Sequence, residues 1–265
     1  MRRWAGLLGI VVLVACDKKD DAKPIAPAAS SLAPSVAPPS SMVVKLSIDP
    51  KGTSKIDMPA PKEHIKAQTS AAVGNLDVDL MNLANTRGEI KVDLTTLKTA
   101  TFGDASKDSA QTMHARAWLE VGDPEKGKIA DDVKAANKYA VFAIRSIDGL
   151  SASDITKISP TKEGNDDVRA VSLTAHGELL VHGHKVPKDI ELEAKIHHPA
   201  GAAPTTAPSM VGITTKKPFK ITLAEHEVKP RDDVGKIAKA AFSLLGTKVA
   251  ETADVSLELR ATPGT

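Results

Sequence analysis

Strict alternation of apolar and polar residues dominates the chain from residue 43 onward. It is clearest over 171–181, where apolar side chains share one face and polar side chains share the other. A period of two residues is typical of a β-strand with one buried and one solvated face. The pattern therefore predicts a β-strand over 171–181.

The same alternation recurs along the chain, and each recurrence predicts a further strand. The segments are 44–48, 76–80, 90–94, 190–196, 219–223 and 255–259. Residues 139–147 are apolar on both faces, so they predict a strand that is covered by another element. These segments give eight predicted strands, and the short stretch 54–58 is a candidate ninth.

Short connections indicate that neighbouring strands run antiparallel. The segments 85–88 and 182–188 each join two predicted strands, and both are too short for a parallel crossover. Eight antiparallel strands can remove their exposed edges by closing into a barrel. We therefore expect an all-β fold, a closed or nearly closed lipocalin-like barrel of about eight strands. A two-sheet sandwich is the alternative.

Two segments predict short α-helices packed on the barrel. Apolar residues over 234–245 follow helical spacing behind the N-cap candidates Asp232 and Asp233. A second helical segment covers 109–119. The stretch 197–215 contains Pro204 and Pro208, with Gly201 and a run of alanines and threonines, and it predicts an irregular loop that packs little.

The N-terminal residues follow a different pattern, typical of a targeting segment. Arg2 and Arg3 precede an apolar run that ends at Cys16. The run of roughly twelve residues spans about 18 Å as a helix, well short of the roughly 30 Å hydrocarbon core of a bilayer. It predicts a signal peptide over 1–15. The last four residues of the run, 13–16, resemble a bacterial lipobox, so Cys16 is the predicted lipidation site rather than a buried cysteine.

The lipidated N-terminus and tether are predicted over 16–41. Prolines, alanines and serines dominate this stretch, and such a composition cannot pack a core. Residues 42–265 then form the barrel domain. We expect a lipoprotein of the cell envelope, anchored to the inner or outer membrane and facing the periplasm. The sequence leaves the choice of membrane and the oligomeric state open.

Charge and composition exclude several functional classes. The chain has 35 Lys and Arg against 33 Asp and Glu, so it lacks the basic face typical of nucleic-acid binding. Loss of Arg2 and Arg3 with the signal peptide would leave equal numbers of basic and acidic side chains. A protein without net positive charge is not held at an anionic membrane by electrostatic attraction, so acyl chains would have to anchor it. A single cysteine excludes an intrachain disulfide.

Catalytic and metal-binding motifs are not found in the sequence. It has no nucleophile elbow, phosphate loop or dinucleotide fingerprint, so no enzyme activity and no cofactor are expected. The acidic pairs are interpreted as solvated turns or helix caps; they lie at 131–132, 166–167 and 232–233. Without thiolate partners or a zinc-helix motif, the grouped histidines are interpreted as surface residues on loops, and no metal site is expected; they are His176, His182, His184, His197 and His198.

Several short motifs resemble those of the YceI-like proteins. They lie at 74–80 (GNLDVDL), 88–99 (GEIKVDLTTLKT), 114–119 (HARAWL), 138–142 (KYAVF) and 177–185 (GELLVHGHK). The resemblance covers roughly residues 43–262. It implies an extended, lipocalin-like antiparallel barrel, and some members of that family enclose a polyisoprenoid chain such as a quinone tail. Ala140 stands where the family usually has proline, and the stretch 197–215 also departs from the pattern.

The predicted function is binding or carriage of an amphiphilic, chain-like lipid, either polyisoprenoid or quinone-like. Aliphatic strand faces suit a long apolar cavity, but they suit a filled core equally well, so the residues alone leave both open. The family resemblance favours the cavity. The alternative is a packed, ligand-free barrel that acts as an envelope interaction module. The predicted lining residues are Leu76, Val78, Ile90, Val92, Phe142, Ile144, Leu173, Leu179, Leu192, Phe219, Ile221, Val255 and Leu257.

Overall fold

A computed structural model describes residues 42–59, 64–228 and 250–264. The predicted signal peptide, the tether with Cys16, and the predicted helix over 234–245 with Asp232 and Asp233 lie outside these ranges. Within the described ranges, no helix is long and apolar enough to cross a membrane.

The described residues form strands in a single sheet, with two α-helices and four short 3-10 helices. The strands are β1 (Val43–Ile48), β2 (Thr53–Pro59), β3 (His64–Thr69), β4 (Ala72–Asp79), β5 (Arg87–Asp93), β6 (Lys98–Thr99), β7 (Tyr139–Asp148), β8 (Thr161–Glu163), β9 (Asp166–Val181), β10 (His184–Pro199), β11 (Met210–Thr215), β12 (Phe219–Thr222) and β13 (Thr252–Pro263). The helices are α1 (Ala105–Trp118), α2 (Asp131–Asn137), η1 (Leu83–Asn85), η2 (Leu94–Thr96), η3 (Ile155–Lys157) and η4 (Leu223–His226).

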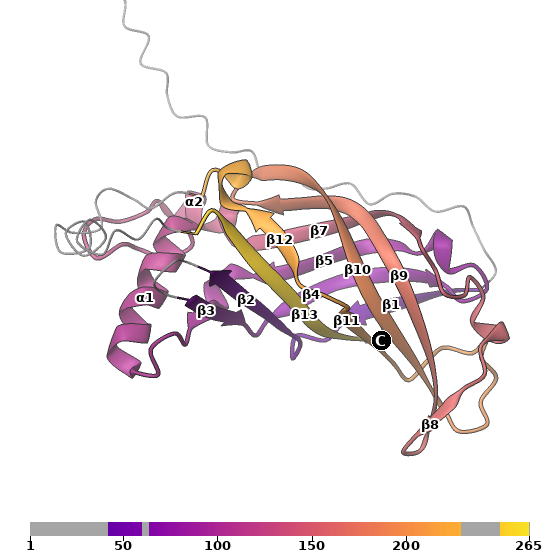
Figure 1. Cartoon of the computed structure of the whole chain (residues 1–265). Helices are drawn as coiled ribbons and strands as arrows, with labels where there is room; N and C mark the ends of the chain where they lie inside the picture. Colours follow the sequence, from indigo (N-terminus) through magenta and orange to yellow (C-terminus); the bar gives the residue numbers. More distant parts are fainter. Residues whose placement is uncertain (1–41, 60–63, 229–249, 265) are drawn as a thin grey trace, which may run out of the picture.

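Eight strands form a closed antiparallel ring, which confirms the predicted fold class (Figure 1). The hydrogen-bonded order is β1, β4, β5, β7, β9, β10, β11 and β13, and β13 pairs back onto β1. The closing contact is short: Leu46 lies opposite Pro263, and Ile48 lies opposite Ala261. The sandwich alternative is therefore excluded, because a sandwich leaves its two sheets unjoined at an edge.

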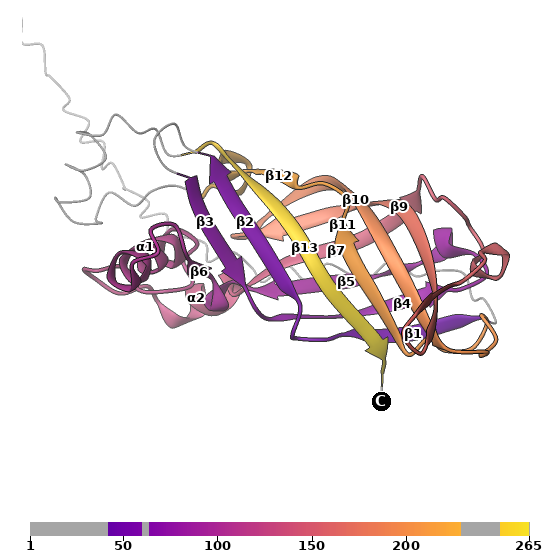
Figure 2. The same cartoon turned by 60° about the horizontal axis from the view of Figure 1, so that its bottom comes forward.

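The two halves of strand β13 pair with different strands, so the two ends of the ring differ. The C-terminal half of β13 pairs with β1 and β11, whereas its N-terminal half pairs with β2 and β12. From β2 the sheet continues through β3 to β6, so the wall at this end departs from the eight-strand ring. Figure 2 shows β2 and β3 running beside β13 toward the end of the molecule where α1 lies.

The hydrophobic core fills the end of the ring where β13 meets β1. Leu46, Leu76 and Leu259 are among its most buried side chains. Strand β7 is buried on both faces, as its sequence predicts: Phe142 belongs to this core, and Ala143 belongs to a small second cluster.

Helix α1 covers the other end of the sheet and confirms the predicted helix over 109–119, with a start four residues earlier. Its N-cap is Asp104, whose carboxylate accepts hydrogen bonds from the backbone N–H groups of Ser106 and Lys107. Thr99 of β6 donates to the carbonyl of Asp108, which ties the helix to the sheet. The short helix α2 was not predicted.

The predicted loop over 197–215 is wrong at both ends. Strand β10 continues to Pro199, and residues 210–215 form β11, a full member of the ring. Val211 and Ile213 are buried in the core, so this stretch packs far more than its composition indicates. The segment 182–188 is also shorter as a loop than expected, because only His182 and Gly183, both with positive φ, make the turn.

Candidate functional site

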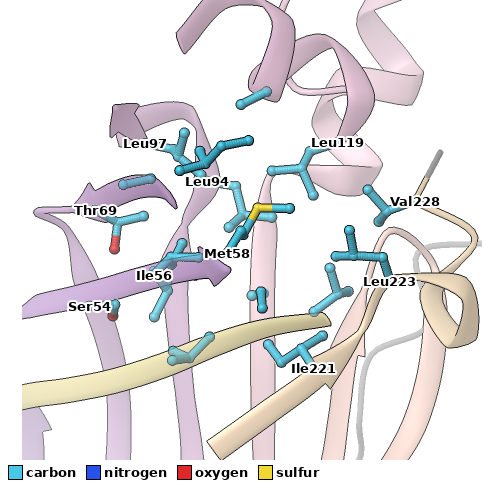
Figure 3. Close-up of a pocket in the computed structure, with 18 of the residues that line it drawn as sticks. Ser54, Ile56, Met58, Thr69, Leu94, Leu97, Leu119, Ile221, Leu223 and Val228 are labelled. Carbon is cyan, nitrogen blue, oxygen red and sulfur yellow. The ribbon is translucent and has the colours of Figure 1, made fainter. Parts of the chain in front are cut away.

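A large apolar cavity lies inside the sheet at the end where β2, β3 and α1 are found (Figure 3). Its volume is about 840 Å³. Pockets that bind small molecules and cofactors have volumes of about 300–1,000 Å³. The cavity is therefore large enough for an organic ligand.

Alternate residues of several strands point into the cavity, as the pleat of a β-sheet requires. The main contributions are Ser54, Ile56 and Met58 of β2, Ile65, Ala67 and Thr69 of β3, Ile90 and Val92 of β5, Phe219 and Ile221 of β12, and Ala253, Val255 and Leu257 of β13. Most of these side chains are aliphatic. A cavity with such walls is a poor site for water, which needs two to four polar partners.

One end of the cavity abuts the packed core. Leu257 lines the cavity, whereas Leu259, two residues further along the same face of β13, is almost fully buried. Gly52 packs so closely on Leu259 that an added Cβ would lie 2.8 Å from its Cδ2 atom. We call this end, where Ser54, Thr69 and Leu257 lie, the cavity floor.

Helix α1 contributes further polar side chains to the lining. Lys107, Gln111 and His114 come from this helix, whereas the strands contribute mostly aliphatic side chains. Lys107 is exposed, and Phe102, just before the helix, is a large exposed hydrophobic side chain. The wall formed by α1 is therefore amphipathic and partly open to solvent.

A histidine cluster borders the cavity beside η4. His226 is fully buried, and its Nδ1 atom lies 3.1 Å from the carbonyl oxygen of His184. The Nδ1 atom of His182 contacts the carbonyl of His226, and its Nε2 atom lies 3.2 Å from the carboxylate of Glu120. Burial lowers the pKa of His226, so its imidazole is neutral at neutral pH. The cluster joins η4, the β9–β10 turn and the chain after α1.

The interpretation of the grouped histidines as surface loop residues is wrong for most of them. His176, His184, His197 and His198 lie in strands, and His198 is fully buried with its Nε2 atom 3.1 Å from the carbonyl of Thr206. Only His182 lies in a turn. Among the described residues, no three His, Cys, Asp or Glu side chains are grouped to hold a metal ion.

The acidic pairs also differ from one another. The pair 131–132 lies in the first turn of α2 after the N-cap Ala130, so neither aspartate is itself a helix cap, and 232–233 lies outside the described residues. Asp167, however, is a buried carboxylate and not a solvated turn. The Lys162 ammonium and the backbone N–H of Gly201 donate hydrogen bonds to it and lower its pKa. It fastens β8 and the loop after β10 to β9.

Comparisons with known proteins find similar folds at very low sequence identity. No family model matches the chain, and no curated protein matches it. Among solved structures, a polyisoprenoid-binding domain from Saccharophagus degradans is 12% identical, with a TM-score of 0.48 over 84% of this chain and 99% of that one. BcnA from Burkholderia cenocepacia is 14% identical, with a TM-score of 0.42 over 79% and 96%.

A YCEI protein from Campylobacter jejuni is 14% identical, with a TM-score of 0.37 over 75% of this chain and 85% of that one. At these identities and TM-scores the similarity concerns the outline of the fold, and it assigns no ligand to the cavity.

The structure divides the thirteen predicted lining residues into two groups. Eight of them line the cavity, namely Ile90, Val92, Phe142, Leu179, Phe219, Ile221, Val255 and Leu257. The other five lie in or against the packed core, namely Leu76, Val78, Ile144, Leu173 and Leu192. The strand faces were predicted correctly, but the pattern does not reveal where along each strand the filled part ends.

The sequence did not predict the walls formed by β3 and α1. Residues 65, 67 and 69 alternate with polar neighbours, which is a strand signal, but Ala67 and Thr69 carry little of the hydrophobicity that marks a buried face. Helix α1 was predicted, yet its contribution of polar side chains to the lining was not.

Proposed function

We propose that this protein binds an amphiphilic, chain-like lipid of the polyisoprenoid or quinone type in its cavity and carries it without chemical change. The observation that supports the proposal is the apolar cavity of about 840 Å³ enclosed by the sheet. The alternative function, a packed and ligand-free interaction module, predicts a filled interior instead.

Burial of an apolar chain would provide the binding energy. Each methylene transferred from water contributes about 0.8 kcal/mol, so a chain of roughly ten carbons gains about 8 kcal/mol before the entropy cost of binding. The mostly aliphatic walls offer few polar contacts, so they favour long apolar chains over compact polar solutes.

Native mass spectrometry of residues 42–265 tests the proposal. All described strands and their hydrogen-bonded ladders lie within this segment, so it contains the whole of the sheet that the structure describes. We expect co-purified mass in the lipid range, or uptake of an added isoprenoid such as farnesol. A bare polypeptide mass that does not change when isoprenoids are added would contradict lipid carriage and favour the interaction module.

We also propose that acyl chains on Cys16 anchor the protein in the cell envelope, with residues 17–41 as its tether. The support is the apolar run ending at Cys16 and the proline-rich stretch that follows. Metabolic labelling with palmitate and membrane fractionation test this, with Cys16→Ser as the variant. We expect label and membrane association in the unchanged chain and neither in the variant; label retained by the variant would refute the anchor.

A further inference from the structure

Two buried hydroxyl groups at the cavity floor have no hydrogen-bond partner among the described residues. They belong to Ser54 and Thr69, which are 4% and 1% exposed. The two residues lie opposite each other in the register of β2 and β3, and both line the cavity. Figure 3 shows their oxygen atoms beside the carbon side chains of the surrounding walls. Buried hydroxyls are usually satisfied in folded proteins, so an adjacent pair without partners points to a ligand.

A third hydroxyl in the cavity lining, that of Thr99, does have hydrogen-bond partners. Thr99 of β6 also lines the cavity and is buried, but its Oγ1 atom donates to the carbonyl of Asp108 at 2.8 Å and lies 3.0 Å from the hydroxyl of Thr112. Its hydrogen bonding is therefore completed by α1. The hydroxyl at position 99 therefore serves the protein's own structure, whereas the hydroxyls at positions 54 and 69 have no partner among the described residues.

The charges around the cavity restrict what could bind these hydroxyls. Lys107 is the only lysine, arginine or acidic residue in the described lining, and it is exposed on α1. The buried histidine at the cavity, His226, is held neutral by the burial that lowers its pKa. A phosphate or carboxylate at the floor would be a buried charge without a counter-ion, which is strongly unfavourable.

We propose that Ser54 and Thr69 form a hydrogen-bonding site for a neutral oxygen-bearing group, such as an alcohol, phenol or carbonyl, at one end of an apolar chain. This inference rests on the proposed lipid-binding function and specifies its ligand class. The polar end of the ligand lies at the cavity floor, and the chain extends along the aliphatic walls toward α1. Each hydroxyl can both donate and accept, so the site accommodates either kind of oxygen.

The pair would give the protein a preference for oxygenated chains over hydrocarbons. A bound hydrocarbon excludes water from the floor and leaves both hydroxyls unsatisfied, whereas an alcohol satisfies them. Replacing the hydroxyls by methyl groups should therefore weaken alcohol binding and strengthen hydrocarbon binding. A purely structural role for the two residues would not move the two affinities in opposite directions.

The test compares farnesol with the hydrocarbon β-farnesene as competitors of the fluorescent probe N-phenyl-1-naphthylamine, in the segment 42–265. The variant is Ser54→Ala with Thr69→Val, and the single Ser54→Ala variant replaces it if the double variant does not fold. We expect the preference for farnesol to fall about tenfold in the double variant, as the loss of two ordinary hydrogen bonds implies. Thr214→Val, which removes an exposed hydroxyl of β11 outside the cavity lining, is the matched control and should leave the preference unchanged.

The outcomes separate this inference from the proposed function. Competition by both compounds, with the same preference in the variant as in the unchanged protein, would overturn the role of Ser54 and Thr69 and leave lipid binding intact. Failure of the unchanged protein to bind the probe or either compound would overturn lipid binding, and the inference with it. An equal loss of preference in Thr214→Val would also overturn the inference, because that hydroxyl lies outside the cavity lining.

Discussion

Gly177 of β9 allows a close approach between β7 and β9, two strands that line the cavity. A Cβ atom at this position would lie 2.3 Å from the carbonyl oxygen of Ala143 and 2.7 Å from the Cζ atom of Phe142. The register between β7 and β9 shifts directly beyond this point, between Ile144 and Ser146. The glycine therefore lets the Phe142 ring lie close against β9, where it forms part of the cavity wall.

We predict that Gly177→Ala destabilises the fold by about 1–3 kcal/mol, because the added methyl group must displace backbone or the Phe142 ring. Thermal or urea unfolding measures the effect. Gly212→Ala on β11 is the control, since its nearest neighbour would be the Lys195 Cβ at an ordinary 3.8 Å. Equal stability of the two variants would mean that the close approach at Gly177 relaxes without cost.

His176 lies on the outer face of β9 between two carboxylates. Its Nε2 atom is 2.8 Å from Asp148, and its Nδ1 atom is 2.7 Å from Asp189. The hydrogen bond to Asp148, followed by that to Asp189, raises the pKa of His176 above its ordinary value of 6.5. A raised pKa in the folded state means that the protonated imidazole stabilises the fold.

We predict that this stabilisation is complete below about pH 6.5 and is lost as the pH rises through the raised pKa of His176. His198 and His226 act in the opposite direction, because burial lowers the pKa of each. The measurement is therefore the difference in melting temperature between the unchanged protein and His176→Gln from pH 5 to 9. A difference that is constant across this range would show that protonation of His176 is not linked to folding.

At the scale of elements, the sequence predicted the strands whose buried face contains a long, mainly aliphatic run. Strands β7, β9 and β10 have such faces, and all three were found, although β9 and β10 are longer than predicted. Strand β3 was missed because its inward positions are weakly hydrophobic, and β11 was missed although Val211 and Ile213 point inward, because it is short and follows a proline-containing stretch. Ala67 and Thr69 point inward on β3. Gly212 and the prolines that precede β11 are residues typical of loops, so this stretch was interpreted as a loop.

The candidate site was predicted less completely than the fold for a physical reason. Alternation identifies the inward face of a strand, but filled and hollow parts of a barrel have the same aliphatic face. Leu257 and Leu259 illustrate this: both point inward on β13, yet the first lines the cavity and the second fills the core. Only the three-dimensional arrangement shows that β2, β3 and α1 diverge enough to leave space.

At the scale of the whole molecule, stability and binding compete for the same space. The end of the ring where β13 meets β1 is packed with side chains. The end near α1 instead contains an apolar cavity of about 840 Å³. An apolar cavity deprives its lining atoms of van der Waals contacts, so the ligand-free protein is less stable than a filled barrel would be. A bound chain restores those contacts, and its binding raises the apparent stability.

Filling the cavity from within should therefore move stability and affinity in opposite directions. Ala67 projects into the cavity from β3, so in Ala67→Leu the larger side chain occupies ligand space. We expect the free energy of unfolding to rise by about 1–2 kcal/mol, from roughly 0.8 kcal/mol for each buried methylene, and lipid affinity to fall. Unfolding without ligand and probe displacement by farnesol measure the two effects. Ala170→Leu, on an exposed position of β9, should change neither, and a destabilised Ala67→Leu variant with unchanged affinity would mean that this region is closely packed.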